Sequence, residues 1–306
     1  MKTKEIPKGV YFALATAFIS GFSIFVSKIS VTVLPDPIAF TTLKNLIVAL
    51  VLVGLVFGRG KLAKIRTLKS HEWRNLLLIG AVGGGLPFAL FFSGLILTSA
   101  VSAAFIHKTL FVWVAILAVF FLKERLGILP GLALLILLLA NLLFGGSSSL
   151  HFGFGELLVF LATLLWAIEN MIAKKTLATV DPDLVATFRM GIGAIILLLI
   201  VVLQGNLSIL FSISPGQIVW VLIPCLFLTG YVLTWYRALK FAPATIVASV
   251  LVLSTPITNI LSAIFITQNF PASQFLNLLL VVVGITLIGI LGKKIASIST
   301  PQLKTT

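Results

Sequence analysis

Ten apolar runs of about twenty residues follow one another along this 306-residue chain, and its cations lie almost entirely in alternate connections between them. The runs cover residues 8–29, 37–57, 75–96, 99–121, 127–145, 154–173, 183–203, 217–239, 244–267 and 273–292. Each is long enough to cross a hydrocarbon core of about 30 Å as an α-helix. The sequence therefore predicts an all-α integral membrane protein with ten transmembrane helices.

The positions of the cations predict how this protein is oriented in the membrane. Of the 22 Lys and Arg residues, 18 lie near the two termini or in the even-numbered connections, where Lys8 and Arg237 are counted although they fall at the ends of their runs. The odd-numbered connections carry none. Because cytoplasmic loops carry an excess of Lys and Arg, we expect both termini in the cytoplasm. We expect a multi-pass protein of the cell (inner) membrane.

The composition excludes several classes of protein. With 59% hydrophobic and 10% charged residues, the chain is not an ordinary soluble domain, and its net charge of +14 is a topology signal rather than a sign of nucleic-acid binding. Cys225 is the only cysteine, so no intramolecular disulfide forms. His71, His107 and His151 are too scattered for a metal centre, and no phosphate-binding loop occurs. We expect no enzyme, no cofactor and no direct use of ATP.

The second half of the chain repeats features of the first. Asp36-Pro37 opens the second run, and Lys44 follows eight residues after the aspartate. Asp181-Pro182 opens the seventh run, and Arg189 again follows eight residues later. Each Asp-Pro pair suits a helix start, with the aspartate as N-cap and the proline in the first turn.

Each half holds five apolar runs, an odd number, so the second half must enter the membrane from the opposite side. The sequence thus predicts two inverted five-helix repeats, at residues 8–145 and 153–293, joined by an external linker at Gly145–Ser149. Inverted repeats of this kind characterise secondary transporters, whose substrate site lies near the midplane between the halves. Expected partners are a small-molecule substrate and the lipid bilayer. The sequence gives no oligomeric state.

Several short motifs in this order resemble the drug/metabolite transporter superfamily, specifically its ten-helix EamA-type permeases. They are Ser20-Gly21-Phe22 to Lys28, the run Phe121–Leu126, Ala238-Leu239 with Pro243-Ala244, and Pro256. The resemblance covers residues 8–293. It implies a transporter, and it favours export, because bacterial members of the family commonly export amino acids and other metabolites.

Two lysines within the predicted spans have no acidic residue at their depth. Lys44 and Lys108 each lie more than 10 Å along a predicted helix, Lys108 near the midplane. An unpaired ammonium is costly there unless water or an anionic ligand accompanies it. Lys44 and Lys108 are therefore candidate substrate-binding residues; the alternative is satisfaction by backbone carbonyls. The adjacent His107 is a candidate ligand or proton-coupling group, or else a hydrogen-bonded structural histidine.

Glu169 and Arg189 form a second set of buried charges, expected at similar depth on consecutive helices. One hypothesis is an ion pair that neutralises both groups. Another makes Glu169 a carrier of protons, the candidate coupling ion, or an acceptor for a substrate amine. An ion pair that opens during the cycle would combine the two roles, so we assign both residues to coupling or gating.

Trp113 and Trp166 are candidate aromatic walls of a substrate cavity, with ordinary packing as the alternative. Because the unpaired charges within the spans are cationic, the leading hypothesis is an exporter of amino acids or related carboxylates. The first alternative is a proton-coupled exporter of cationic drugs or amines that uses Glu169. The second is an integral-membrane enzyme, for which the sequence offers no catalytic constellation.

Overall fold

The computed structural model describes residues 5–124, 128–144, 153–269, 275–276, 278–284 and 286. In these residues every regular element is helical, and eight helices are long and apolar enough to cross a membrane. They are α1 (Ile6–Ser30), α2 (Pro37–Gly58), Ser70–Leu97, Ala100–Leu122, α9 (Phe154–Thr176), α10 (Pro182–Leu203), α11 (Pro215–Phe241) and Ala244–Thr267. The helix α8 (Ile128–Phe144) corresponds to the fifth predicted run.

The remaining sequence predictions fall partly outside this range. Half of the tenth predicted run, the linker at Gly145–Ser149 and the end of the second predicted repeat lie outside the described residues. The all-α, multi-span prediction is confirmed for the described part. The count of ten helices and the cytoplasmic position of the termini stay predictions.

Three of the eight spans are interrupted helices. Ser70–Leu97 consists of α4 (Ser70–Ile79), the π-helical segment η2 (Gly80–Gly85) and α5 (Leu86–Leu97). Ala100–Leu122 divides at Thr109 into α6 (Ala100–Lys108) and α7 (Leu110–Leu122). Ala244–Thr267 comprises α12 (Ala244–Val250), η4 (Leu251–Leu253), α13 (Ser254–Ser262) and η5 (Ala263–Thr267). Glycine and proline explain two of these breaks, since Gly83–Gly85 precede Pro87, and Pro256 lacks the N–H that would continue the helix.

Both Asp-Pro pairs start helices as the sequence predicts. The Asp36 carboxylate accepts a hydrogen bond from the Ile38 N–H at 2.7 Å, and Asp181 accepts from the Asp183 N–H at 3.0 Å. Pro37 and Pro182 begin α2 and α10. Lys44 and Arg189 are therefore each the eighth residue of their helix, about 10 Å from its start.

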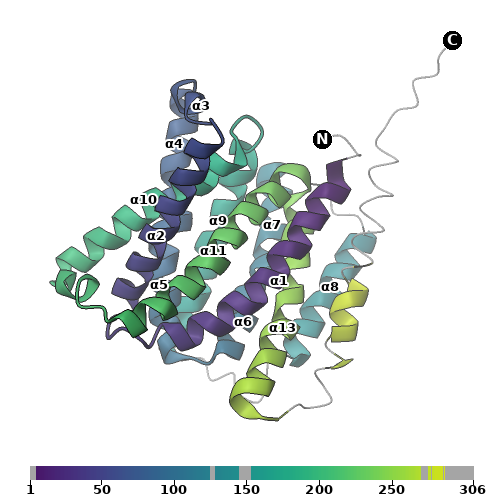
Figure 1. The fold of residues 1–306 in the computed structure, drawn as a ribbon. Helices are drawn as coiled ribbons and strands as arrows, with labels where there is room; N and C mark the ends of the chain where they lie inside the picture. Colours follow the sequence, from purple (N-terminus) through teal and green to yellow (C-terminus); the bar gives the residue numbers. More distant parts are fainter. Residues whose placement is uncertain are drawn as a thin grey trace.

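The helices pack in pairs that repeat between the two halves. In Figure 1, α1 (purple) runs beside α11 (green), and α2 lies against α10; α9 similarly packs along α5. Small residues permit the closest crossings: a Cβ added to Gly155 would lie 2.7 Å from the Leu97 Cβ, and one added to Gly9 would lie 2.7 Å from the Ala242 nitrogen. Such contacts are typical of helices packed in membranes.

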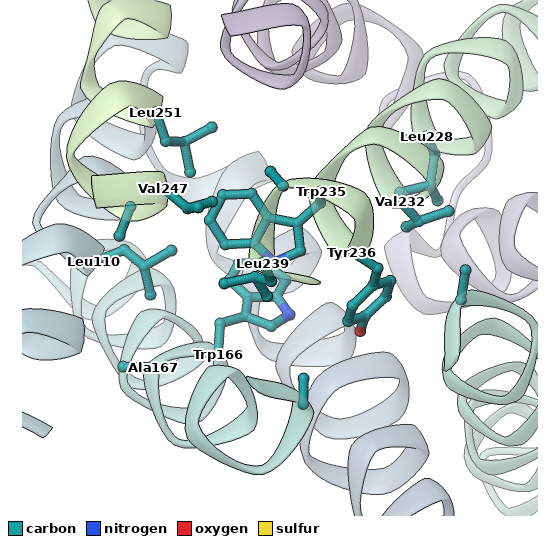
Figure 2. Packing of buried hydrophobic residues seen from close by; sticks show 14 of the residues in the cluster. Leu110, Trp166, Ala167, Leu228, Val232, Trp235, Tyr236, Leu239, Val247 and Leu251 are labelled. Atoms are coloured by element: carbon teal, nitrogen blue, oxygen red, sulfur yellow. The ribbon is translucent and has the colours of Figure 1, made fainter. Parts of the chain in front are cut away.

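The core is a continuous apolar cluster within the bundle, whereas many large apolar side chains face outward, as expected against lipid. Figure 2 shows part of this core, where Trp166 of α9 and Trp235 and Tyr236 of α11 lie among aliphatic side chains. The Trp235 indole N–H donates to Asn170 Oδ1 at 3.1 Å. The hydroxyl of Tyr236 points out of this apolar cluster toward polar residues described next.

Candidate substrate site

A cavity of about 70 Å³ lies within the bundle, and eight helices contribute to its wall. This volume holds a few water molecules or a very small solute. The wall combines charged, aromatic and hydroxyl side chains, namely Ser20, Ser23, Ile24, Ser27, Lys44, Phe88, Phe91, Phe92, His107, Leu110, Trp166, Glu169, Arg189, Leu228 and Tyr231. A drug-sized ligand would require the helices to move apart.

Lys44 of α2 presents its ammonium to aromatic rings rather than to an acid. Its Nζ lies 3.5 Å from the centroid of the Phe92 ring and 5.1 Å from that of Phe88. The side chain is 2% exposed, and within the described residues its ammonium has no hydrogen-bond or ion-pair partner. A desolvated cation–π contact stabilises by about 2 kcal/mol, which offsets only part of the cost of burying the charge. Lys44 thus retains its capacity to bind an anion.

Arg189 of α10 shares an aromatic neighbour with Lys44. Its guanidinium carbon lies 5.5 Å from the centroid of Phe88 and 5.9 Å from that of Tyr236. Nε and Nη1 are buried and have no hydrogen-bond partner in the described part of the chain. Because unsatisfied buried donors are costly, these two nitrogens are suited to a ligand carboxylate or to water.

Glu169 of α9 is the only acidic residue in the cavity wall as described. Its Oε1 accepts a hydrogen bond from the Tyr236 hydroxyl at 2.7 Å. Glu169 and Arg189 both pack against Gly83: a Cβ added to Gly83 would collide with the Glu169 side chain and lie 3.1 Å from Arg189 Nε. The expected direct Glu169–Arg189 ion pair is absent from the described contacts, because the carboxylate is directed to Tyr236 instead. The two groups still face the same cavity.

His107 and Trp166 form the aromatic end of the wall. Their ring centroids lie 4.9 Å apart, and the His107 ring lies 5.5 Å from Phe91. The Trp166 N–H donates to the Gly83 carbonyl at 2.9 Å, which fixes the indole beside the cavity. His107 Nδ1 is buried without a hydrogen-bond partner among the described residues, so it too is open to a ligand or a water molecule.

Lys108 and Trp113, also predicted as candidates, do not line this cavity. Lys108 is 1% exposed, and its Nζ donates to Ser20 Oγ at 2.9 Å. Trp113 donates to Thr109 Oγ1 at 3.3 Å and packs edge-on against Phe160. Neighbouring helical residues point about 100° apart, so His107 lines the cavity while Lys108 reaches it only through its hydrogen bond to the wall residue Ser20.

Sequence reasoning missed several wall residues, in particular Phe88, Phe92, Tyr231 and the serines of α1. The serines carried a usable signal, since positions 20, 23 and 27 fall on one face of a helix that is otherwise largely apolar. The phenylalanines carried none, because aromatic residues are frequent along the whole chain. No three His, Cys, Asp or Glu side chains among the described residues gather to hold a metal ion.

One end of the bundle carries an ion-pair network, here called the Asp181 cluster. It joins the connection after α2 to α10 and α11, through Arg59, Lys61, Lys64, Asp181, Asp183 and Arg237. Lys61 donates to Asp181 at 2.8 Å and to Asp183 at 2.7 Å. Burial would raise the pKa of Asp181, but hydrogen bonds from Lys61 and Lys64 outweigh it and hold this pKa well below its usual range. Asp181 is therefore ionised at neutral pH.

The opposite end carries a counterpart of this network in which an asparagine replaces the cation. Asn206 Nδ2 donates to Asp36 Oδ2 at 2.7 Å. Asn206 follows Asp181 by 25 residues, as Lys61 follows Asp36, and each comes directly after a glycine with positive φ, Gly205 or Gly60. The Lys61–Asp181 and Asn206–Asp36 contacts thus join equivalent positions of the two halves. In the first contact both partners are charged, whereas in the second only the aspartate is.

Comparison with known proteins identifies the family. The sequence profile of the EamA-like transporter family matches residues 7–146 and again residues 153–290. The chain belongs to the EamA-like transporter family, within the drug/metabolite transporter superfamily. An uncharacterized transporter of Archaeoglobus fulgidus is 26% identical over 243 residues, which cover 77% of this chain and 81% of that protein.

A further relative agrees with this assignment, and a solved structure shares the fold. An uncharacterized transporter of Synechocystis is 26% identical over 303 residues, covering 92% of this chain and 86% of the relative. A protein of known crystal structure superposes with a TM-score of 0.74 at 16% identity, covering 94% of this chain and 97% of that one. The last likeness concerns the fold. Family and relatives together make this EamA-family protein a multi-pass membrane transporter.

Proposed function

We propose that this transporter is a secondary exporter of small organic anions or zwitterions, such as amino acids or related carboxylates, in the cell (inner) membrane. The observation that carries the substrate class is the charge of the cavity wall. It holds two cationic side chains, Lys44 and Arg189, but a single carboxylate, Glu169. In a site of low dielectric an excess positive charge favours an anionic ligand strongly. Export follows from the family resemblance.

An amino-acid zwitterion would use both kinds of charge. Its carboxylate would satisfy Lys44 or the unpartnered nitrogens of Arg189, and its ammonium would approach Glu169. The rings of Phe88 and Phe92 keep the cations in place without neutralising them. Among the described residues the wall offers no second acid, so an organic cation, the substrate of the alternative hypothesis, would meet net repulsion.

The two ends of the bundle support alternating access between two inverted repeats, residues 8–145 and 153–293. In the orientation predicted by the positive-inside rule, the Asp181 cluster closes the cytoplasmic end and the Asp36–Asn206 contact closes the external end. Each contact joins one half of the chain to the other, so opening either end requires that it break. Rocking of one half against the other would expose the cavity to each side in turn.

Glu169 is our candidate for proton coupling. Its carboxylate accepts a hydrogen bond from the Tyr236 hydroxyl, and its side chain packs against Gly83 beside Arg189. Protonation of Glu169 would therefore weaken its interaction with both residues. A substrate carboxylate that engages Arg189 would weaken the hold of Arg189 on Glu169 and favour its protonation. His107 is a second candidate for this role, since its Nδ1 is buried on the same cavity.

A substrate screen on the purified protein tests this function. Thermal unfolding of the full chain in detergent would be followed with single L-amino acids, short mono- and dicarboxylates, and organic cations such as tetraphenylphosphonium. We expect stabilisation by at least one carboxylate-bearing solute and none by the cations, because only a ligand of the folded state raises its unfolding temperature. Hits would then be tested for transport in liposomes, with and without a proton gradient. Stabilisation by cations alone would favour the drug-exporter alternative.

A further inference from the structure

The two halves of the cavity differ at one equivalent position. Lys28 and Lys174 make equivalent hydrogen bonds in the two halves. Lys28 donates to the carbonyls of Leu95 and Thr98 at 2.7 and 2.5 Å. Lys174 donates to the carbonyls of Leu239 and Ala242 at 2.5 and 2.7 Å. These contacts align the first helices of the two halves. Five residues before each lysine stand Ser23 and Glu169, which both line the cavity.

The cations of the cavity are equivalent in the same way. Lys44 and Arg189 each follow an N-capping aspartate by eight residues and share the Phe88 ring. In the second half, Arg189 therefore has a carboxylate from the preceding helix in the same wall. In the first half, Lys44 has Ser23 at the equivalent position, and its charge is matched by no acid among the described residues.

The serines of α1 that line the same cavity as Lys44 are available for bonding. Ser23 and Ser27 lie on the cavity face of α1, one turn apart, and have no hydrogen-bond partner among the described residues. Ser20, one turn earlier, already accepts from Lys108. Hydroxyl groups donate well to a carboxylate, and such charge-assisted bonds are about twice as strong as neutral ones.

We propose that the substrate's carboxylate binds in the Lys44 half of the cavity, between Lys44 and the hydroxyls of Ser23 and Ser27. It there takes the position that the Glu169 carboxylate occupies in the other half. The proposal rests on the proposed function, because it assigns an orientation to the anionic substrate. The rest of the substrate then extends toward Arg189 and Glu169, so an α-amino group is recognised by the single acid of the wall.

A pair of isosteric substitutions tests this assignment. Ser23→Asp places a carboxylate opposite Lys44, whereas Ser23→Asn adds the same volume without charge. The full-length variants would be purified and their thermal unfolding measured with L-alanine, L-glutamate or succinate. We expect Ser23→Asp to unfold at a higher temperature than Ser23→Asn without solute, because its carboxylate pairs with Lys44. We expect its affinity for the stabilising solute to be at least about tenfold lower than that of Ser23→Asn.

The outcomes separate this inference from the proposed function. If the unsubstituted protein binds a carboxylate and Ser23→Asp binds it as well as Ser23→Asn, the orientation is wrong and the function stands. If no carboxylate-bearing solute of the substrate screen stabilises or is transported by the unsubstituted protein, both proposals are overturned.

A second experiment tests the same assignment without requiring Ser23→Asp to fold, because the charge is introduced after the protein has folded. Ser23→Cys in a Cys225→Ala background would be modified after folding with a sulfonatoethyl or a hydroxyethyl thiosulfonate. Both adducts reduce the space in the cavity, but only the sulfonatoethyl adduct is anionic. We therefore expect it to weaken carboxylate binding more than the hydroxyethyl adduct does. Equal losses with the two adducts would contradict the proposal.

Discussion

Lys61 Nζ lies 2.8 Å from Asp181 Oδ1, and the equivalent residues of the opposite halves, Asn206 and Asp36, are in contact at the other end of the bundle. The same backbone device, a glycine with positive φ after a transmembrane helix, positions Lys61 and Asn206. Lys61 belongs to an ion-pair network, whereas Asn206 forms a neutral-to-charged hydrogen bond. The two ends of the transporter are therefore built alike and closed with unequal strength.

Neutralising Asp181 should open the end closed by the Asp181 cluster. The reporter is Ser23→Cys in a Cys225→Ala background, labelled by an impermeant thiol reagent from either face of the membrane. In Asp181→Asn we expect labelling from the cytoplasmic face to rise at least about threefold, because partly exposed ion pairs contribute up to about 1 kcal/mol each. Asp36→Asn is the matched control and should leave cytoplasmic labelling unchanged. Equal labelling in both variants would contradict the gating role.

Strengthening the weaker end should have the opposite effect. Asn206→Lys places an ammonium beside Asp36 and so reproduces the Lys61–Asp181 contact at the other end. We expect external labelling of the same reporter cysteine to fall and transport to slow. Asn206→Gln, which keeps an amide, is the control. An Asn206→Lys variant with unchanged external labelling would show that this contact does not limit opening.

The Asp181 cluster should be insensitive to pH in the physiological range. Because the pKa of Asp181 is held below its usual value, its contribution to stability is present above the unfolded-state pKa of about 3.9 and is lost as pH falls through the lower, folded-state pKa. Because thiol labelling itself depends on the thiolate fraction, the readout is the ratio of cytoplasmic labelling in Asp181→Asn to that in the protein that keeps Asp181, with the same reporter cysteine. This ratio should stay constant between about pH 5 and 8 and fall only below about pH 4. A pH dependence of labelling between pH 5 and 8 that is seen with Asp181 and is absent from Asp181→Asn would contradict this prediction.

Two glycines of α10 provide a matched test of the packing around Arg189. A Cβ added to Gly193 would collide with the Gly84 backbone of η2, whereas one added to Gly191 meets nothing within 4 Å. Gly193→Ala should lower stability by about 1–3 kcal/mol through overpacking. Gly191→Ala should be neutral or stabilising by up to about 1 kcal/mol, because alanine favours the helix. Thermal unfolding in detergent compares them, and similar unfolding temperatures would rule out this close crossing.

The features predicted from sequence were those fixed by local chemistry. Span length, the Asp36 and Asp181 caps, and the equal spacing to Lys44 and Arg189 depend on residues close together in the chain. Depth in the membrane follows from the same counting, since the rise of a helix is constant. Lys44 and Arg189 accordingly line one cavity. His107 and Glu169, which were also predicted as candidates, line it too.

The direction in which a side chain points was beyond such counting. The break at Thr109 and the rotation of α6 decide that His107 faces the cavity and Lys108 faces Ser20. Likewise, the partner of Glu169 is Tyr236, 67 residues later in the chain, and a phenol carries no charge signal that would have suggested it. Tertiary packing sets both arrangements.

The charge pattern of the cavity is tested most directly by uptake into liposomes of the carboxylate-bearing solute identified in the binding screen. Lys44→Gln, Lys108→Gln and Glu169→Gln would be compared at equal protein content. We predict that Lys44→Gln loses at least about tenfold in uptake, since it removes an unpaired charge from a site of low dielectric. Lys108→Gln should retain most activity, because glutamine can still bond Ser20, and Glu169→Gln should retain binding but lose dependence on a proton gradient. Full activity in Lys44→Gln, or uptake of organic cations that requires Glu169 and not Lys44, would contradict the anion-transport account.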